Sequence, residues 1–78
     1  MDGMLKLVGK SINQYKYSKG MHLEFSDDNS GIIYHVWIYE KNPLFHKNTG
    51  LELLNRYRVT GWTNDQNYVI DLVSIESL

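Results

Sequence analysis

Short segments in which every second residue is apolar, separated by turn-forming residues, run through most of this 78-residue sequence. A period of two is the pattern of β-strands. The pattern predicts five strands, at Met4–Ile12, Met21–Ser26, Ile32–Glu40, Arg56–Trp62 and Tyr68–Ile75. The last of them is apolar with one acid, which predicts a strand that is covered on most sides. The chain is therefore expected to be all-β.

The strand pattern is interrupted in a few places that predict bends and connections. Gly9 and Gly61 stand inside strands, where glycine indicates a bulge or a sharp bend. The acidic and polar run 27–31 ends in glycine and predicts a turn. Residues 13–20 predict either a polar loop or a twisted extension of the first strand. Residues 42–55 lose the period of two and carry a proline near their start, which predicts a short helix or a capping loop.

The third predicted strand has no polar face. A half-buried strand should alternate apolar with polar residues. Here one face holds Ile32, Tyr34, Val36 and Ile38, and the other holds Ile33, His35, Trp37 and Tyr39. The second face therefore packs beneath the helical segment or at a subunit interface, or it presents rings to a ligand.

Size and composition limit the class of protein. Seventy-eight residues make one domain, and 42% apolar residues suffice for one compact core. The chain has no cysteine, which excludes a disulfide framework and thiolate zinc sites and favours the cytoplasm. The first residues do not resemble a signal peptide, and no apolar run approaches the ~18 residues of a membrane span. The small size and the Asn-, Lys-, Tyr- and Ile-rich composition favour a small bacterial or phage protein, acting in replication, recombination or a mobile element.

The charges are arranged in blocks, although the net charge is only −1. Residues 3–23 carry four lysines and no acid, and residues 24–40 carry four acids and neither lysine nor arginine. Residues 41–58 carry four bases and one acid, and residues 59–78 carry three acids. Such blocks predict either one basic face in the folded chain or chance clustering over a solvated surface.

Five segments, in order, resemble one family. They are Leu7–Lys10, His22–Asp27, Ile33–Ile38, Tyr57–Gly61 and Tyr68–Glu76, and together they cover nearly the whole chain. The sequence resembles the nucleic-acid-binding OB family found in tRNA-synthetase anticodon-binding domains and in the large subunit of exonuclease VII. The resemblance implies a single OB domain over residues 1–78, a five-stranded Greek-key barrel with a short helix between its third and fourth strands.

The same resemblance implies a binding surface across the second and third strands, flanked by two loops. Its ligand would be single-stranded nucleic acid, DNA rather than RNA, with rings stacking on bases and cations following the phosphates. The residues expected there are Lys10, Tyr15, Lys16, Tyr17, Lys19, His22, His35, Trp37, Tyr39, Arg58 and Trp62. The alternative is a protein-interaction module, a small inhibitor or an adaptor, which uses the same aromatic face to dock a partner or its own copy. No membrane partner is expected.

Catalytic and metal chemistry find little support. His22, His35 and His46 are far apart in sequence and have no cysteine beside them, so no metal site and no cofactor is expected. His22 and His35 are nevertheless predicted as possible cross-strand neighbours. No nucleophile stands with a base, and the paired acids lie in a turn, so the chain is not expected to be an enzyme. Arg56 and Arg58 are expected to contact phosphates or to pair with acids such as Asp71.

Overall fold

A computed structural model describes residues 1–78, apart from the side chain of Tyr15. Its elements, in chain order, are β1 (Asp2–Tyr15), β2 (Ser18–Ser26), β3 (Ile33–Tyr39), α1 (Leu44–Lys47), β4 (Arg56–Thr63) and β5 (Tyr68–Ser77). The predictions of an all-β domain and of a short helix between the third and fourth strands are confirmed. In the part of the chain that the structure describes, no helix is long and apolar enough to cross a bilayer.

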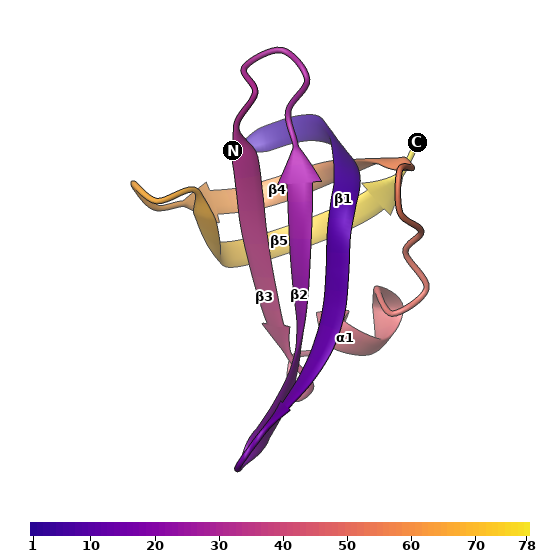
Figure 1. The fold of residues 1–78 in the computed structure, drawn as a ribbon, viewed down its shortest axis with the longest axis vertical. Coiled ribbons are helices and arrows are strands. Elements are labelled where there is room, and N and C mark those ends of the chain that lie inside the picture. Colours follow the sequence, from indigo (N-terminus) through magenta and orange to yellow (C-terminus); the bar gives the residue numbers. More distant parts are fainter.

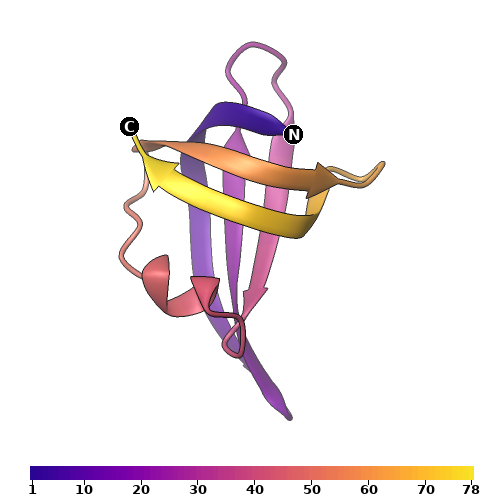
Figure 2. The same ribbon diagram turned by 180° about the vertical axis from the view of Figure 1, so that it is seen from behind.

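The five strands form one closed sheet. Their order is β1-β2-β3-β5-β4, and β4 pairs back onto β1. All of these pairings are antiparallel except β3 with β5, which are parallel and pair at only two positions, His35 with Tyr68 and Val36 with Val69. In Figure 1, β1, β2 and β3 stand side by side while β4 and β5 cross behind them. Figure 2 shows the other side, where the first residues of β1 bend over to run beside β4.

Both bend glycines lie at irregularities of the sheet, as the sequence predicts. The β1–β2 register shifts between Leu7 and Gly9, and the β4–β5 register shifts between Thr60 and Gly61. At Gly61 an added Cβ would lie 2.7 Å from the backbone oxygen of Asp71, so only glycine fits without a shift of the backbone. The bends allow β1 to pair with β4 through its first residues and with β2 through the rest.

The core lies inside the closed sheet. Phe45 of α1 is 2% exposed and joins the same cluster as the strand residues, so the helix covers one end of the interior. Asn48 is also buried, and its amide donates a 2.7 Å hydrogen bond to the Leu44 carbonyl. Burial of each large apolar side chain stabilises the fold by about 1.5–3 kcal/mol. The buried apolar residues are Leu5, Leu7, Met21, Leu23, Phe25, Val36, Ile38, Phe45, Tyr57, Val59 and Val69.

The structure decides between the two predictions for residues 13–20, and it contradicts the prediction for the last strand. Residues 13–20 extend the strands rather than form a loop, with a turn at 16–17, so the β1–β2 hairpin projects as a narrow arm at the bottom of Figure 1. The prediction that the last strand is covered on most sides is wrong. Ile70 and Val73 of β5 are 66% and 59% exposed, so one face of this strand is open to solvent.

Candidate functional site

Five aromatic rings form a continuous row on the outer face of β2, β3 and β5. Tyr68 stacks on His35 with ring centroids 4.9 Å apart and planes inclined by 24°. His22 follows, with its centroid 5.3 Å from that of His35 and 6.3 Å from that of Trp37. Tyr39 ends the row in an edge-to-face contact with Trp37 at 5.6 Å. We call these five residues the aromatic row.

The side chains of His35, Trp37 and Tyr39 point outward because residues alternate in direction along β3. Val36 and Ile38 are buried, and successive side chains of a strand point to opposite faces. Phe45 of α1 belongs to the same core cluster as Val36 and Ile38, so the helix lies on the other side of β3 from Trp37. Of the alternatives left open for Trp37, packing beneath the helical segment is therefore not the one observed. The sheet presents its ring to the outside instead.

Trp37 lies flat over a glycine of the neighbouring strand. A Cβ added at Gly20 would lie 2.7 Å from Cε2 of the indole and closer still to Cζ2. Gly20 pairs with Tyr39 in the β2–β3 register, and His22 pairs with Trp37. Because Gly20 has no side chain, the indole can pack directly against the backbone of β2.

His22 and His35 contact each other edge to edge. Nε2 of His22 lies 3.1 Å from Nδ1 of His35, and the two ring planes differ by only 14°. A ring nitrogen lies on the rim of the imidazole, so a centroid separation of 5.3 Å is close to the largest that this N···N distance permits. The two nitrogens therefore lie almost on the line between the centroids, and the rings are nearly coplanar. The predicted cross-strand neighbours are in fact a hydrogen-bonded pair.

The β4–β5 loop holds Tyr68 beside His35. The side-chain oxygen of Asn64 accepts hydrogen bonds from the backbone N–H groups of Gln66, at 2.9 Å, and Tyr68, at 3.0 Å. Asn67 adopts a positive φ of 64°, and its carbonyl accepts a 2.8 Å hydrogen bond from the backbone N–H of His35. Tyr68 is not among the site residues that the sequence predicts. The signal that could have found it is the adjacency of the third and fifth strands.

Lys10 lies apart from the row, although it was predicted to be part of the site. Its ammonium donates hydrogen bonds to the backbone carbonyls of Thr49 and Leu51, the latter at 3.0 Å. These carbonyls belong to the segment between α1 and β4, on the inner side of β1. Lys10 therefore ties that segment to the sheet.

The arginines of β4 pair with acids. Arg58 donates from Nε and Nη2 to the two carboxylate oxygens of Asp2, at 2.9 and 2.7 Å. This fork lowers the pKa of the Asp2 carboxyl and raises the pKa of the guanidinium. Arg56 lies 2.5 Å from a carboxylate oxygen of Asp28 and lowers its pKa in the same way. Of the alternatives left open for these arginines, pairing with acids is the one observed.

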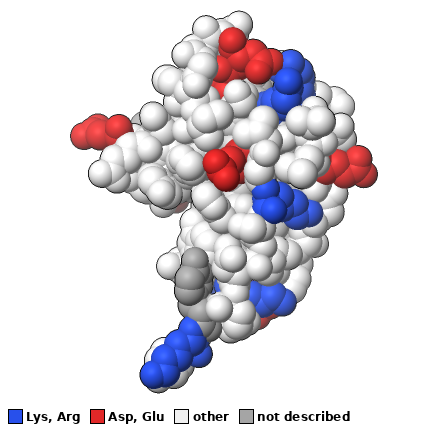
Figure 3. All heavy atoms as spheres, in the orientation of Figure 1, with Lys and Arg blue, Asp and Glu red and all other residues white. Residues whose placement is uncertain are grey.

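The charge blocks do not combine into one basic face on the side of β1, β2 and β3. In Figure 3 this side is mostly white, with blue and red groups scattered across it. Arg56 pairs with Asp28, and Lys19 pairs with Glu40 at 3.6 Å, so each joins a base to an acid from another block. Arg58 pairs with Asp2, which precedes the first block. The face of the sheet that carries the aromatic row is thus largely uncharged.

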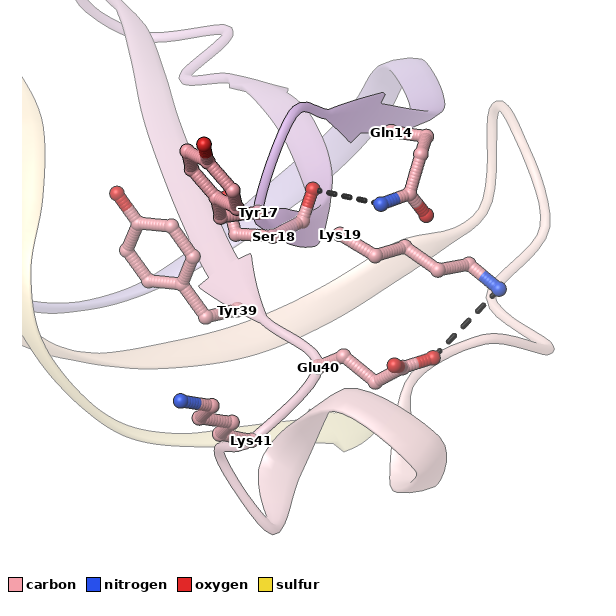
Figure 4. Close-up of a pocket in the computed structure, with 7 residues that line it drawn as sticks. All are labelled: Gln14, Tyr17, Ser18, Lys19, Tyr39, Glu40 and Lys41. Carbon is pink, nitrogen blue, oxygen red and sulfur yellow. Dashed lines mark hydrogen bonds and ion pairs between the residues drawn. The ribbon is translucent and has the colours of Figure 1, made fainter.

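The tip of the β1–β2 hairpin adjoins the end of the row. The Lys16 ammonium lies 5.3 Å from the ring centroid of Tyr17, which is 87% exposed. A hollow of about 270 Å³ lies here, lined by Gln14, Tyr17, Ser18, Lys19, Tyr39, Glu40 and Lys41. Figure 4 shows the two tyrosine rings together on one side of it, while Lys19 and Glu40 extend the other way. Tyr17 is therefore the hairpin residue that comes next to the row.

Of the remaining predicted site residues, Trp62 stands outside the row. Trp62 of β4 is 66% exposed and pairs with Asp71 of β5 in the sheet. Tyr15 is opposite Ser18 in the β1–β2 register, but its side chain lies outside the described part of the chain. Among the side chains that the structure describes, no three His, Cys, Asp or Glu come together as a metal site.

Comparisons of the chain with protein-family models, with curated proteins and with solved structures gave no match.

Proposed function

We propose that this chain is an OB-type barrel that binds single-stranded nucleic acid without catalysing a reaction, and that DNA is its ligand rather than RNA. The observation that carries the proposal is the aromatic row, a series of rings with successive centroids 4.9–6.3 Å apart. Rings on a sheet surface can stack with successive unpaired bases, and each stacked base contributes about 1–3 kcal/mol. Because every base has a flat face, such binding tolerates many sequences.

The OB-type assignment is supported by the connectivity of the sheet. The strand order β1-β2-β3-β5-β4, the parallel contact of β3 with β5 and the helix between β3 and β4 agree with that topology. The row lies on β2, β3 and the start of β5, with the β1–β2 hairpin at one end and the β4–β5 loop at the other. The lack of cysteine supports a reducing compartment, and we propose the cytoplasm.

The chain's two tryptophans allow a direct test. Fluorescence would be followed while oligo-dT is added to two single-tryptophan variants, Trp62→Phe and Trp37→Phe, at two salt concentrations. If the row is the binding surface, Trp62→Phe is quenched, because its only indole lies in the row. Trp37→Phe responds weakly, because Trp62 lies on β4. Binding must also weaken as salt rises, since phosphates are contacted. Equal quenching of the two variants, or no response at high micromolar oligonucleotide, would reject the proposal. Parallel titrations with an RNA oligomer and with duplex DNA test the preference for single-stranded DNA.

A protein-interaction module is the second candidate, and one observation favours it. The face that carries the row is mostly uncharged in Figure 3, and interfaces between proteins are depleted of charge at their centres. The exposed Ile70 of β5 follows Tyr68 at the end of the row and adds apolar surface. Size-exclusion chromatography with light scattering tests docking of the chain to its own copy. A concentration-dependent dimer that is lost in Trp37→Ala would favour this role over nucleic-acid binding.

A further inference from the structure

The aromatic row lacks a fixed positive charge at its centre. Lys10 is bound to loop carbonyls, Arg58 is paired with Asp2, and Lys19 is paired with Glu40. Lys16 lies at the hairpin tip, over Tyr17. A strand lying across β2 and β3 would bring a phosphate backbone to this face, and single-strand grooves normally supply cations along it. The row therefore needs another source of charge, or it binds by stacking alone.

Two histidines form the middle of the row. Their 3.1 Å N···N contact requires one nitrogen to donate its proton and the other to accept it. In the neutral pair, the donor ring keeps a free lone pair on its second nitrogen. Adding one proton there makes the donor an imidazolium, which strengthens the shared hydrogen bond because charge-assisted bonds are roughly twice as strong as neutral ones. Adding a second proton would place two N–H groups face to face and break the contact. The geometry thus favours the uptake of one proton by the pair.

Groups from three strands surround the pair. Glu24 of β2 pairs with His35 in the sheet register, and its carboxylate lies over Gly9 of β1, 2.8 Å from where a Cβ would be. Ser11 of β1 is opposite His22. From β5 the ring of Tyr68 stacks on His35, and an aromatic face attracts a cation. Of these surrounding groups, Glu24 is the acidic side chain.

We propose that the His22–His35 pair takes up a single proton and then serves as the phosphate-contacting cation of the aromatic row. This inference rests on the proposed function, and it adds a regulation of the same site by pH. Histidine changes its charge between roughly pH 5 and pH 8. Because protonation is favoured as the pH falls, nucleic-acid binding is stronger under mildly acidic conditions and weaker above neutrality.

The test compares oligo-dT affinity at about pH 8 and about pH 5.5. Thymine has no ring nitrogen that gains a proton in this range, so a change in affinity belongs to the protein. The wild-type protein is expected to bind about tenfold more tightly at the lower pH, as expected for one additional hydrogen bond to a charged group. The slope of log K against log salt should also steepen by about 0.7, the value for one further phosphate contact on a single strand.

Histidine variants show whether the pH dependence of the affinity comes from the His22–His35 pair or from another histidine. His35→Gln and His22→Gln keep a polar side chain but cannot form the charged pair, so each should lose the pH dependence. His46→Gln is the matched control, because His46 is exposed on α1 and contacts Phe45 rather than the row. It should keep the full effect. A pH dependence that survives in both His35→Gln and His22→Gln would overturn the inference.

An NMR titration of the histidine ring signals gives a readout without ligand. We expect the His22 and His35 signals to move together, in one step that corresponds to a single proton. Independent titration of the two rings would overturn the inference even if the oligonucleotide binds. Binding at pH 8 with no change at pH 5.5 would also overturn it, while leaving the proposed function intact. No binding at either pH would reject the proposed function and the phosphate contact together, and the NMR titration would still decide whether the pair shares one proton.

Discussion

Replacement of Gly20 by alanine tests the packing of the Trp37 indole against Gly20. The added Cβ would lie 2.7 Å from Cε2 and 3.1 Å from Cη2 of the indole, whereas ordinary van der Waals contact begins at 3.4 Å. The indole must therefore lift or rotate away from β2. Overpacking of this kind costs about 1–3 kcal/mol. Because Trp37 is only half-buried and has room to move outward, we expect a loss of about 1 kcal/mol. For a domain of this size, that corresponds to a fall in Tm of about 4–8 °C.

The assay combines thermal unfolding with fluorescence in a Trp62→Phe background, so that Trp37 is the only emitter. We expect a lower Tm and a red-shifted emission, because the indole moves toward solvent. Gly50→Ala is the matched control, since a Cβ at Gly50 would meet nothing within 4 Å. It should leave Tm unchanged or slightly raised, because alanine restricts the unfolded chain. Unchanged Tm and unshifted emission in the Gly20→Ala variant would refute the contact between Trp37 and Gly20.

Three further substitutions test the bend at Gly61, the packing of α1 on the core and the Asp2–Arg58 ion pair. Gly61→Ala places a Cβ 2.7 Å from the Asp71 backbone oxygen, which cannot rotate away, so urea unfolding should show a loss of about 2–3 kcal/mol. A wild-type urea midpoint would contradict the bend. Phe45→Ala should cost about 3–5 kcal/mol by calorimetry, and a small change would mean that α1 does not close the core. Arg58 lowers the pKa of Asp2, so this pair stabilises the fold above the ordinary carboxyl pKa and is lost as pH falls through the lowered one. Circular dichroism between about pH 5 and pH 2 should show a larger loss of stability for the wild type than for Asp2→Asn, and identical acid profiles would count against the ion pair.

The local pattern was sufficient to predict most of the fold. Alternation of side chains along β3 correctly separated Val36 and Ile38 from His35 and Trp37, because a strand can bury only one face against the core. The sequence also predicts the bulge at Gly9, and the structure shows its consequence for Lys10. One extra residue reverses which face the following side chains occupy, so Lys10 turns inward to the loop carbonyls rather than outward to the row.

Long-range pairing was harder to predict than local pattern. The sequence presents Tyr68 only as the first residue of the last strand. Its place in the row follows from the parallel contact with His35, 33 positions earlier in the chain. The acid partners of Arg56 and Arg58 are similarly distant in sequence, and Asp71, the acid that the sequence suggested, pairs with Trp62 in the sheet instead. Contacts of this kind depend on how the sheet closes, which no short window of sequence contains.

The two-position contact between β3 and β5 has a mechanical consequence. It is the shortest strand pairing of the closed sheet. Separating these two strands breaks the fewest backbone hydrogen bonds, so the sheet opens here at the lowest free energy. The stacked rings of His35 and Tyr68 stand on the two sides of this pairing. A molecule that binds across both rings only while the strands are paired stabilises this pairing, and the stabilisation rises with the logarithm of its concentration once that concentration exceeds the Kd. The proposed binding surface thus includes the shortest strand pairing of the sheet.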